Sequence, residues 1–110
     1  MDCLFCKIIA GEIPCSKVYE DDKILAFNDI APKAPVHVLI VPKEHIESAA
    51  HLCGREDISG AVFNAAATIA KDLGLVNGFR VVTNCGEDGR QSVRHLHFHL
   101  LGGKALSEDM

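Results

Sequence analysis

The arrangement of apolar and polar positions predicts one long helix among several short strands. Apolar residues recur at the i, i+4 and i+7 spacing of one helix face from Ile58 to Leu73, and Gly74 follows as a stop signal. The run 36–41 is β-branched and almost wholly apolar, as a strand covered on both faces must be, so we expect it to be a central strand. Further strand-like runs cover 17–20, 23–27, 79–84 and 95–101.

The first thirty residues predict a short helical turn followed by a hairpin. Residues 4–9 are mostly apolar and are followed by glycine and proline breakers. The acidic pair at 21–22 separates two strand-like runs and suits a tight turn. Strands clustered around one long helix indicate an α+β fold with a mainly antiparallel sheet. No repeat or linker divides residues 1–110, so we expect a single domain.

Composition narrows the class of protein. The chain has 110 residues, 48% of them hydrophobic, which is enough for one modest core. The 11 Lys and Arg against 15 Asp and Glu give a net charge of −4, whereas a nucleic-acid-binding surface normally needs a basic stripe. The amino end lacks the pattern of a secretory signal and no apolar run has membrane-spanning length. We therefore expect a cytoplasmic protein with neither nucleic acid nor membrane as partner.

Three histidines share one side of the last predicted strand. His95, His97 and His99 alternate with apolar residues, and strand side chains change face at every residue, so the three imidazoles project from one side. The other side is apolar and is expected to belong to the core. Three imidazoles at this spacing could converge on one zinc or copper ion, so a purely metal-binding strand is one interpretation.

The loop that enters this strand favours a second interpretation. Residues 84–92 combine glycines with amide and hydroxyl donors, and such a loop can aim its donors at an anion, although an ordinary β-turn would also explain the glycines. A neutral imidazole beside a phosphate can attack phosphorus with one ring nitrogen, provided that a fixed acceptor holds the proton of the other.

These residues closely resemble the histidine triad superfamily, whose signature is His-x-His-x-His-x-x with x apolar, here 95–101. The segments around the signature are similar to the nucleotide-binding Hint branch of that superfamily, and the resemblance runs from about Cys3 to Gly103. It covers the segments 27–30, 34–37, 41–46, 91–93 and 102–103.

The resemblance implies a dimer-forming α+β fold and a hydrolase that cleaves the P–N bond of purine nucleoside 5′-phosphoramidates. It makes His97 the nucleophile of a covalent nucleotidyl-histidine intermediate, with no metal needed for the chemistry. His99 and His37 would lie around the phosphate, and Asp29 would bind the ribose hydroxyls. Polar contacts would come from Asn84, Gln91 and Ser92, with Ser92 close to the leaving group. The apolar base pocket would consist of Leu4, Phe5, Ile8, Phe27 and Ile30, which could equally be core residues.

The pair Cys3-x-x-Cys6 has a spacing familiar from zinc sites, but two thiolates need two more ligands to complete a tetrahedron. Five cysteines, an odd number, also favour reduced thiols or a metal over a disulfide framework. By resemblance to related proteins, His45 and His95 would complete a structural zinc site. The alternative is a pair of reduced, partly buried thiols.

Two departures from the family pattern leave the substrate open. Arg90 replaces the usual small residue before Gln-Ser, where it could either bind substrate phosphate or obstruct it. The chain after Gly103 lacks the aromatic, proline-bearing tail of some members. A dinucleoside polyphosphate hydrolase is therefore an alternative function, and a non-catalytic nucleotide-binding or zinc-binding interaction protein is another.

Overall fold

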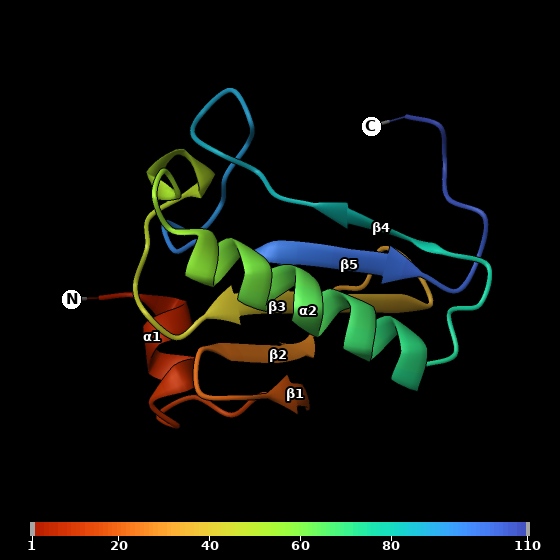
Figure 1. Cartoon of the computed structure of the whole chain (residues 1–110), viewed down its shortest axis with the longest axis horizontal. Helices are drawn as coiled ribbons and strands as arrows, with labels where there is room; N and C mark the ends of the chain where they lie inside the picture. The colour runs from red at the N-terminus through yellow and green to blue at the C-terminus, as the bar shows by residue number, and fades with distance from the viewer. Residues whose placement is uncertain (1, 110) are drawn as a thin grey trace.

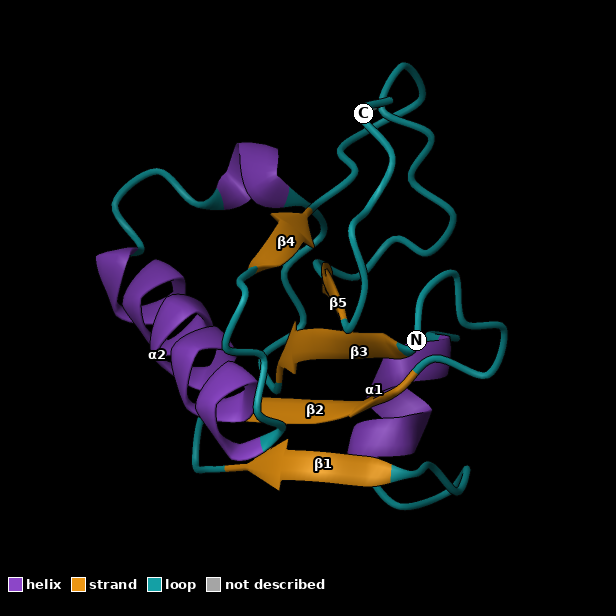
Figure 2. Cartoon of the chain, turned by 90° about the vertical axis from the view of Figure 1, so that its right-hand side faces the viewer, coloured by secondary structure: helices purple, strands orange, loops and turns teal. Residues whose placement is uncertain are grey.

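The computed structural model describes residues 2–109 and has the predicted α+β architecture. A five-stranded antiparallel sheet has the order β1-β2-β3-β5-β4 (Figure 1). Figure 2 shows the two α-helices on opposite faces of this sheet. The elements are α1 (Leu4–Ile9), β1 (Lys17–Glu20), β2 (Ile24–Asn28), β3 (Val36–Pro42), the short 3-10 helix η1 (Ala49–His51), α2 (Glu56–Asp72), β4 (Phe79–Val82) and β5 (Phe98–Gly102).

The predicted hairpin is confirmed, and Asp21 forms its turn. One carboxylate oxygen of Asp21 accepts the backbone N–H groups of Lys23 and Ile24, both at 2.8 Å. Its other oxygen accepts the Tyr19 hydroxyl at 2.6 Å. An aspartate that satisfies backbone donors two and three residues ahead stabilises a tight reversal of the chain.

Strand β3 is the central strand, as its apolar run predicted. It pairs with β2 on one side and β5 on the other, and its residues from His37 to Pro42 are all buried. Val38 and Ile40 face α2, while Leu39 and Val41 face α1. A strand covered on both faces needs apolar residues at successive positions, and that is why the alternation of a half-exposed strand is absent here.

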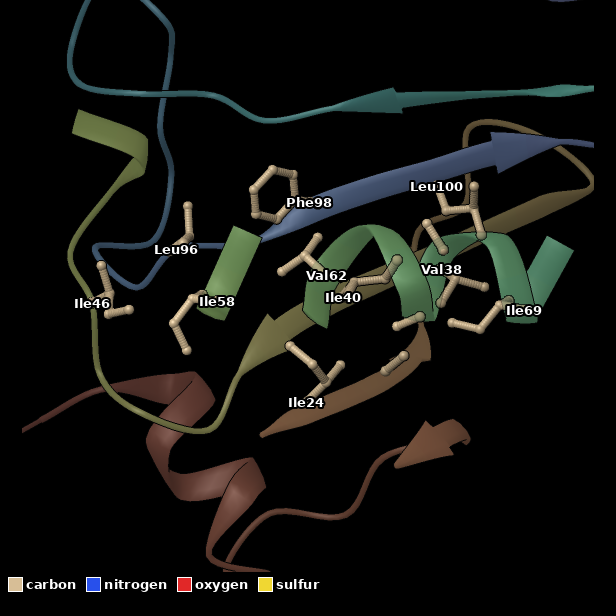
Figure 3. Close-up of a cluster of buried hydrophobic side chains, with 13 residues drawn as sticks. Ile24, Val38, Ile40, Ile46, Ile58, Val62, Ile69, Leu96, Phe98 and Leu100 are labelled. Carbon is tan, nitrogen blue, oxygen red and sulfur yellow. The ribbon is translucent and has the colours of Figure 1, made fainter. Parts of the chain in front are cut away.

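Helix α2 covers the larger core (Figure 3). Ile58, Val62 and Ile69 lie on its buried face, at the spacing that predicted the helix. The predicted end at Leu73 is one residue too long, because Leu73 is the C-cap and is 44% exposed. Within residues 2–109, no helix has the length and apolarity needed to cross a membrane.

The face of the sheet that carries the imidazoles is also covered, as the apolar run 36–41 predicted for a strand buried on both faces. Helix α1 packs on this face and forms a second apolar cluster, in which Phe5 and Phe27 are each 4% exposed. The expectation that the side opposite the imidazoles belongs to the core is confirmed, and the imidazole side holds a second, smaller cluster. A six-residue helix has little stability of its own, so its position depends on tertiary contacts that no local pattern reveals.

The last strand begins three residues later than predicted. Ladder pairing starts at Phe98, whereas the backbone N–H of Leu96 donates to the carbonyl oxygen of Ile46 at 2.6 Å. The predicted division of faces nevertheless extends back to residue 95. Leu96 and Phe98 lie in the core under α2, and the three imidazoles lie on the α1 side.

Candidate active site

His97 lies immediately before β5, and one hydrogen bond fixes which of its ring nitrogens carries a proton. Its Nδ1 lies 2.8 Å from the backbone carbonyl oxygen of His95. Because a carbonyl oxygen only accepts hydrogen bonds, Nδ1 carries the proton of the neutral ring, and in this tautomer Nε2 keeps its lone pair. The residue is 3% exposed and lines a cavity of about 500 Å³. An unprotonated imidazole nitrogen at a cavity wall is suited to act as a nucleophile.

A chain of two further hydrogen bonds fixes the protons of His37 and His99. The backbone N–H of Lys33 donates to Nδ1 of His37 at 3.0 Å, so the proton of this ring is on Nε2. His37 Nε2 lies 2.9 Å from Nδ1 of His99 and donates to it. The proton of His99 is therefore on its own Nε2, where it can be donated to a ligand in the cavity that His99 also lines.

Burial keeps both of these imidazoles neutral. Burial, reinforced by the neighbouring His97 and His37, lowers the pKa of His99 to about 4. The pKa of His37 is also lowered, mainly by burial, although the carboxylate of Asp29 opposes this shift. Asp29 Oδ2 lies 3.5 Å from His37 Nε2, farther than the 2.9 Å to His99, so His99 is the better acceptor. Neutral rings at pH 7 are what the proton assignment requires.

The wall of the cavity combines polar and apolar side chains. Its polar side chains include Asp29, Ser92, His97 and His99. All five residues predicted for a base pocket also line the wall, namely Leu4, Phe5, Ile8, Phe27 and Ile30. Phe5 and Phe27 serve the second core as well, whereas the side chain of Ile30 is fully exposed at the rim. A cavity of this size with few convergent polar groups is typical of a small-molecule site.

Cys3, Cys6, His45 and His95 come together at the start of α1, from three distant parts of the chain. The Nδ1 atom of His95 lies 3.4 Å from Cys3 Sγ and 3.6 Å from Cys6 Sγ, and His45 Nδ1 lies 3.3 Å from Cys6 Sγ. Bond lengths of about 2.3 Å to sulfur and 2.0–2.1 Å to nitrogen give a tetrahedral zinc site an S···N separation of about 3.5 Å. The four donors therefore fit a zinc ion.

A backbone contact leaves His95 with the correct nitrogen for such an ion. Its Nε2 donates to the carbonyl oxygen of Pro42 at 2.8 Å, so the lone pair is on Nδ1, which faces the two thiols. The three imidazoles of the triad thus have different partners: the thiols for His95, a carbonyl for His97 and another imidazole for His99. The interpretation of a metal-binding strand required all three imidazoles to converge on one ion. Within residues 2–109 they do not form such a group.

Comparison with known proteins agrees with this geometry. A model of the HIT domain matches residues 10–106. The chain belongs to the HIT domain family. The resemblance to the histidine triad superfamily and its Hint branch is thereby confirmed.

Relatives of this HIT domain match over almost all of its length. It is 47% identical over 109 residues to a Brassica juncea protein named 14 kDa zinc-binding protein, covering 96% of each chain. It is 46% identical over 108 residues to an Arabidopsis thaliana protein named adenylylsulfatase HINT1, covering 94% of this chain and 73% of the relative. The solved structure of a histidine triad protein from Clostridium difficile is 51% identical, with a TM-score of 0.96 and coverage of 100% and 97%.

The amides of Asn84 and Gln91 fold the loop that enters the triad. Asn84 Nδ2 donates to the carbonyl oxygen of Gly89 at 2.7 Å. The Gln91 amide oxygen accepts the Gly86 N–H at 2.9 Å, and its nitrogen donates to the carbonyl oxygens of Glu47 and Val93. Of the three residues predicted to contact phosphate, only Ser92 lines the cavity. Direct contact of the two amides with a ligand stays a prediction.

Several residues that position the site were not found from the sequence. The Thr83 hydroxyl donates to the carbonyl oxygen of His97 at 2.8 Å, and backbone groups of Lys33 and Pro42 select the tautomers of His37 and His95. Backbone partners carry no residue signature, so only the folded chain reveals them. The cavity wall also includes Ile13, Pro14, Cys15, Ser16, Asn28, Leu39 and Val93.

Proposed function

We propose that this HIT domain is a nucleotide hydrolase that cleaves purine nucleoside 5′-phosphoramidates at the P–N bond. The observation that carries the proposal is the hydrogen bond from His97 Nδ1 to the His95 carbonyl oxygen, which leaves Nε2 unprotonated at the cavity. Membership of a family with a relative named as an adenylylsulfatase supports hydrolysis at a nucleotide phosphorus.

In the first step, the lone pair of His97 Nε2 attacks phosphorus and forms an N–P bond. The bond from phosphorus to the amine breaks, and the departing nitrogen takes a proton from solvent through the Ser92 hydroxyl, which lies at the cavity wall. In the second step, water attacks the same phosphorus and releases a proton to solvent. The N–P bond breaks, its electrons return to Nε2, and a nucleoside monophosphate leaves.

The polar side chains of the cavity wall would supply charge stabilisation for both steps. The Nε2–H of His99 would donate to the non-bridging phosphoryl oxygens, where negative charge increases in the transition state. His99 stays neutral at pH 7. The hydrogen bond that its Nδ1 accepts from His37 keeps its one proton on Nε2, so the ring can donate without being protonated by solvent.

The nucleoside would lie with its base against the apolar side chains of the cavity wall and its ribose at Asp29. One carboxylate oxygen of Asp29 accepts the Ala31 N–H at 2.8 Å, which orients the group. Its other oxygen would accept the ribose hydroxyls. A large flat base suits the aromatic and aliphatic wall formed by Phe5, Phe27 and Ile8.

We further propose a structural zinc ion held by Cys3, Cys6, His45 and His95. The donor distances and the tautomer of His95 support it, as does the relative named as a zinc-binding protein. When bound, the ion would tether α1 to the segment that carries His97, and the hydrolytic steps use only protein groups. None of the five cysteines forms a disulfide, a state that suits the cytoplasm.

A homodimer is the proposed assembly, through the edge strand β4 and the adjoining end of α2. Exposed apolar side chains gather there: Val76 is 90% exposed and Phe79 is 45% exposed, and both line a hollow with Ala67 of α2. In sedimentation experiments we expect a dimer for the native chain and a monomer for Phe79→Glu. Ile30→Glu, which alters an exposed apolar side chain elsewhere, should stay dimeric. A monomeric native chain would contradict the proposal.

Two substrates test the proposed activity against its alternatives. We expect release of ammonia and AMP from adenosine 5′-phosphoramidate, with a kcat/KM well above that for a diadenosine polyphosphate. The reverse preference would identify a dinucleoside polyphosphate hydrolase. A protein that binds AMP in calorimetry but cleaves neither substrate would be a nucleotide-binding interaction protein, and the proposed activity would be wrong.

A further inference from the structure

The nucleotide cavity adjoins a second cavity on the far side of Ser92. This second cavity has a volume of about 410 Å³ and shares Leu4, Ser92 and Val93 with the first. Its wall also includes Arg94. Ser92 thus lies between the space assigned to the nucleotide and a space large enough for another chemical group. A leaving group attached to phosphorus beside Ser92 would extend toward this second cavity.

The second cavity contains one unpaired cation. Asp2 lines the same wall, but its carboxylate is paired with Lys7 at 2.8 Å. Arg94 is exposed and forms no ion pair within residues 2–109. The remaining polar side chains of the wall, Cys3 and His45, belong to the candidate zinc site. A leaving group that enters this space therefore meets Arg94, a cation without an ion-pair partner in residues 2–109, on a wall that also carries the Asp2 carboxylate.

Arg90 is a second exposed cation in the same loop, two residues before Ser92, and its backbone is strained. Its φ of 63° is the only positive φ of a non-glycine residue within residues 2–109. The turn that imposes it is closed by the Arg90 N–H on the Glu87 carbonyl oxygen and by the Gln91 N–H on the Gly86 carbonyl oxygen, both at 3.0 Å. The left-handed region is unfavourable for a residue with a Cβ and favours glycine or asparagine.

An arginine retained at a position that disfavours it suggests a use for its side chain. The guanidinium of Arg90 is exposed, and no ion pair joins it to the neighbouring carboxylates of Glu87 and Asp88 in the described chain. Arginine is also the side chain best matched to planar oxyanions, because its donors form a rigid fork. Along the sequence, the two arginines lie two residues before and two residues after Ser92, on a chain whose net charge is −4.

We propose that Arg90 and Arg94 form a leaving-group subsite that selects nucleotides whose leaving group carries an oxyanion, such as the carboxylate of an amino acid joined through its nitrogen. The inference rests on the proposed function and adds the charge of the leaving group to it. The arginines do not contact the breaking bond; they bind the distal end of the leaving group and so raise kcat/KM for anionic substrates over neutral ones of the same size.

The test compares two phosphoramidates of AMP that differ only in charge, one made with glycine and one with glycinamide. For the native protein we expect kcat/KM to be higher for the glycine compound by roughly tenfold, since each exposed ion pair contributes a factor of a few. The double variant Arg90→Asn/Arg94→Gln should bring this ratio close to one. Asparagine tolerates the left-handed backbone, so the turn is preserved. The matched control Lys23→Gln removes an exposed cation between β1 and β2, away from both cavities, and should leave the ratio unchanged.

Two results would overturn the subsite. One is a native ratio of one or less. The other is a double variant that keeps the native ratio, and if both compounds then lose activity equally, the arginines are assigned to the nucleotide phosphate. If the native protein cleaves neither compound, the proposed activity fails separately. In that case, calorimetry measures the binding affinities of the glycine and glycinamide compounds for the His97→Ala variant. Equal affinities for the two compounds would again reject the subsite.

Discussion

Replacement of His97 by alanine is expected to lower kcat for adenosine 5′-phosphoramidate by at least roughly a thousandfold, because the variant lacks the atom that bonds to phosphorus. KM should change far less, since the wall of the cavity and Asp29 remain. The ring packs edge-on against Phe5 at a centroid distance of 5.1 Å, so its truncation also leaves a small void. This void should cost on the order of 1–2 kcal/mol of folding stability.

A fold defect must be separated from a chemical one. His97→Gln fills most of the void and keeps a hydrogen-bonding group, but lacks the nucleophilic imidazole nitrogen. It should be as inactive as the alanine variant while its thermal unfolding midpoint stays close to native. AMP binding measured by calorimetry should survive in both variants. A glutamine variant that retains more than a tenth of native kcat would reject covalent catalysis by this residue.

Removal of the metal is expected to have the largest effect on stability. The chain as purified without chelator should contain about one zinc per molecule, and a strong chelator should lower the free energy of unfolding by on the order of 3 kcal/mol or more. For a domain of this size, this corresponds to a drop of roughly 10–20 °C in Tm. The reason is that α1 has only six residues and is held to the sheet at Cys3 and Cys6.

Loss of the metal should also weaken nucleotide binding. Helix α1 contributes Leu4, Phe5 and Ile8 to the cavity wall, and Phe5 contacts the rings of both His95 and His97. The double variant Cys3→Ser/Cys6→Ser should therefore show a lower Tm and a higher KM, whereas Cys53→Ser, at an exposed cysteine outside the cluster, should show neither. A zinc-free protein with an unchanged Tm would contradict the proposed site.

The periodicity of the sequence predicted the sheet, the long helix and the face on which the histidines lie. These features depend on a two-residue or 3.6-residue repeat that tertiary contacts did not override. The boundaries were less accurate: β5 begins at Phe98 because the peptide groups of Leu96 and His97 bond to Ile46 and Thr83. Because these partners are distant in the sequence, the local pattern of apolar and polar residues does not predict them.

The candidate site was predictable in its residue types but not in its proton positions. The signature at 95–101 indicated three histidines on one face, and the resemblance implied their division between catalysis and metal binding. The sequence could not indicate that Lys33, Pro42 and His95 use backbone groups to select three tautomers. Nor could it indicate that α1 covers the imidazole face, since that packing depends on Phe5 meeting residues far along the chain.

The most direct test of the central claim is a crystal structure of the protein with AMP. The account predicts that phosphorus lies about 3–3.5 Å from Nε2 of His97, with the base between α1 and β2 and the ribose hydroxyls on Asp29. It is contradicted if the AMP phosphorus lies beyond reach of that nitrogen, or if Nε2 of His97 is found coordinated to a metal ion.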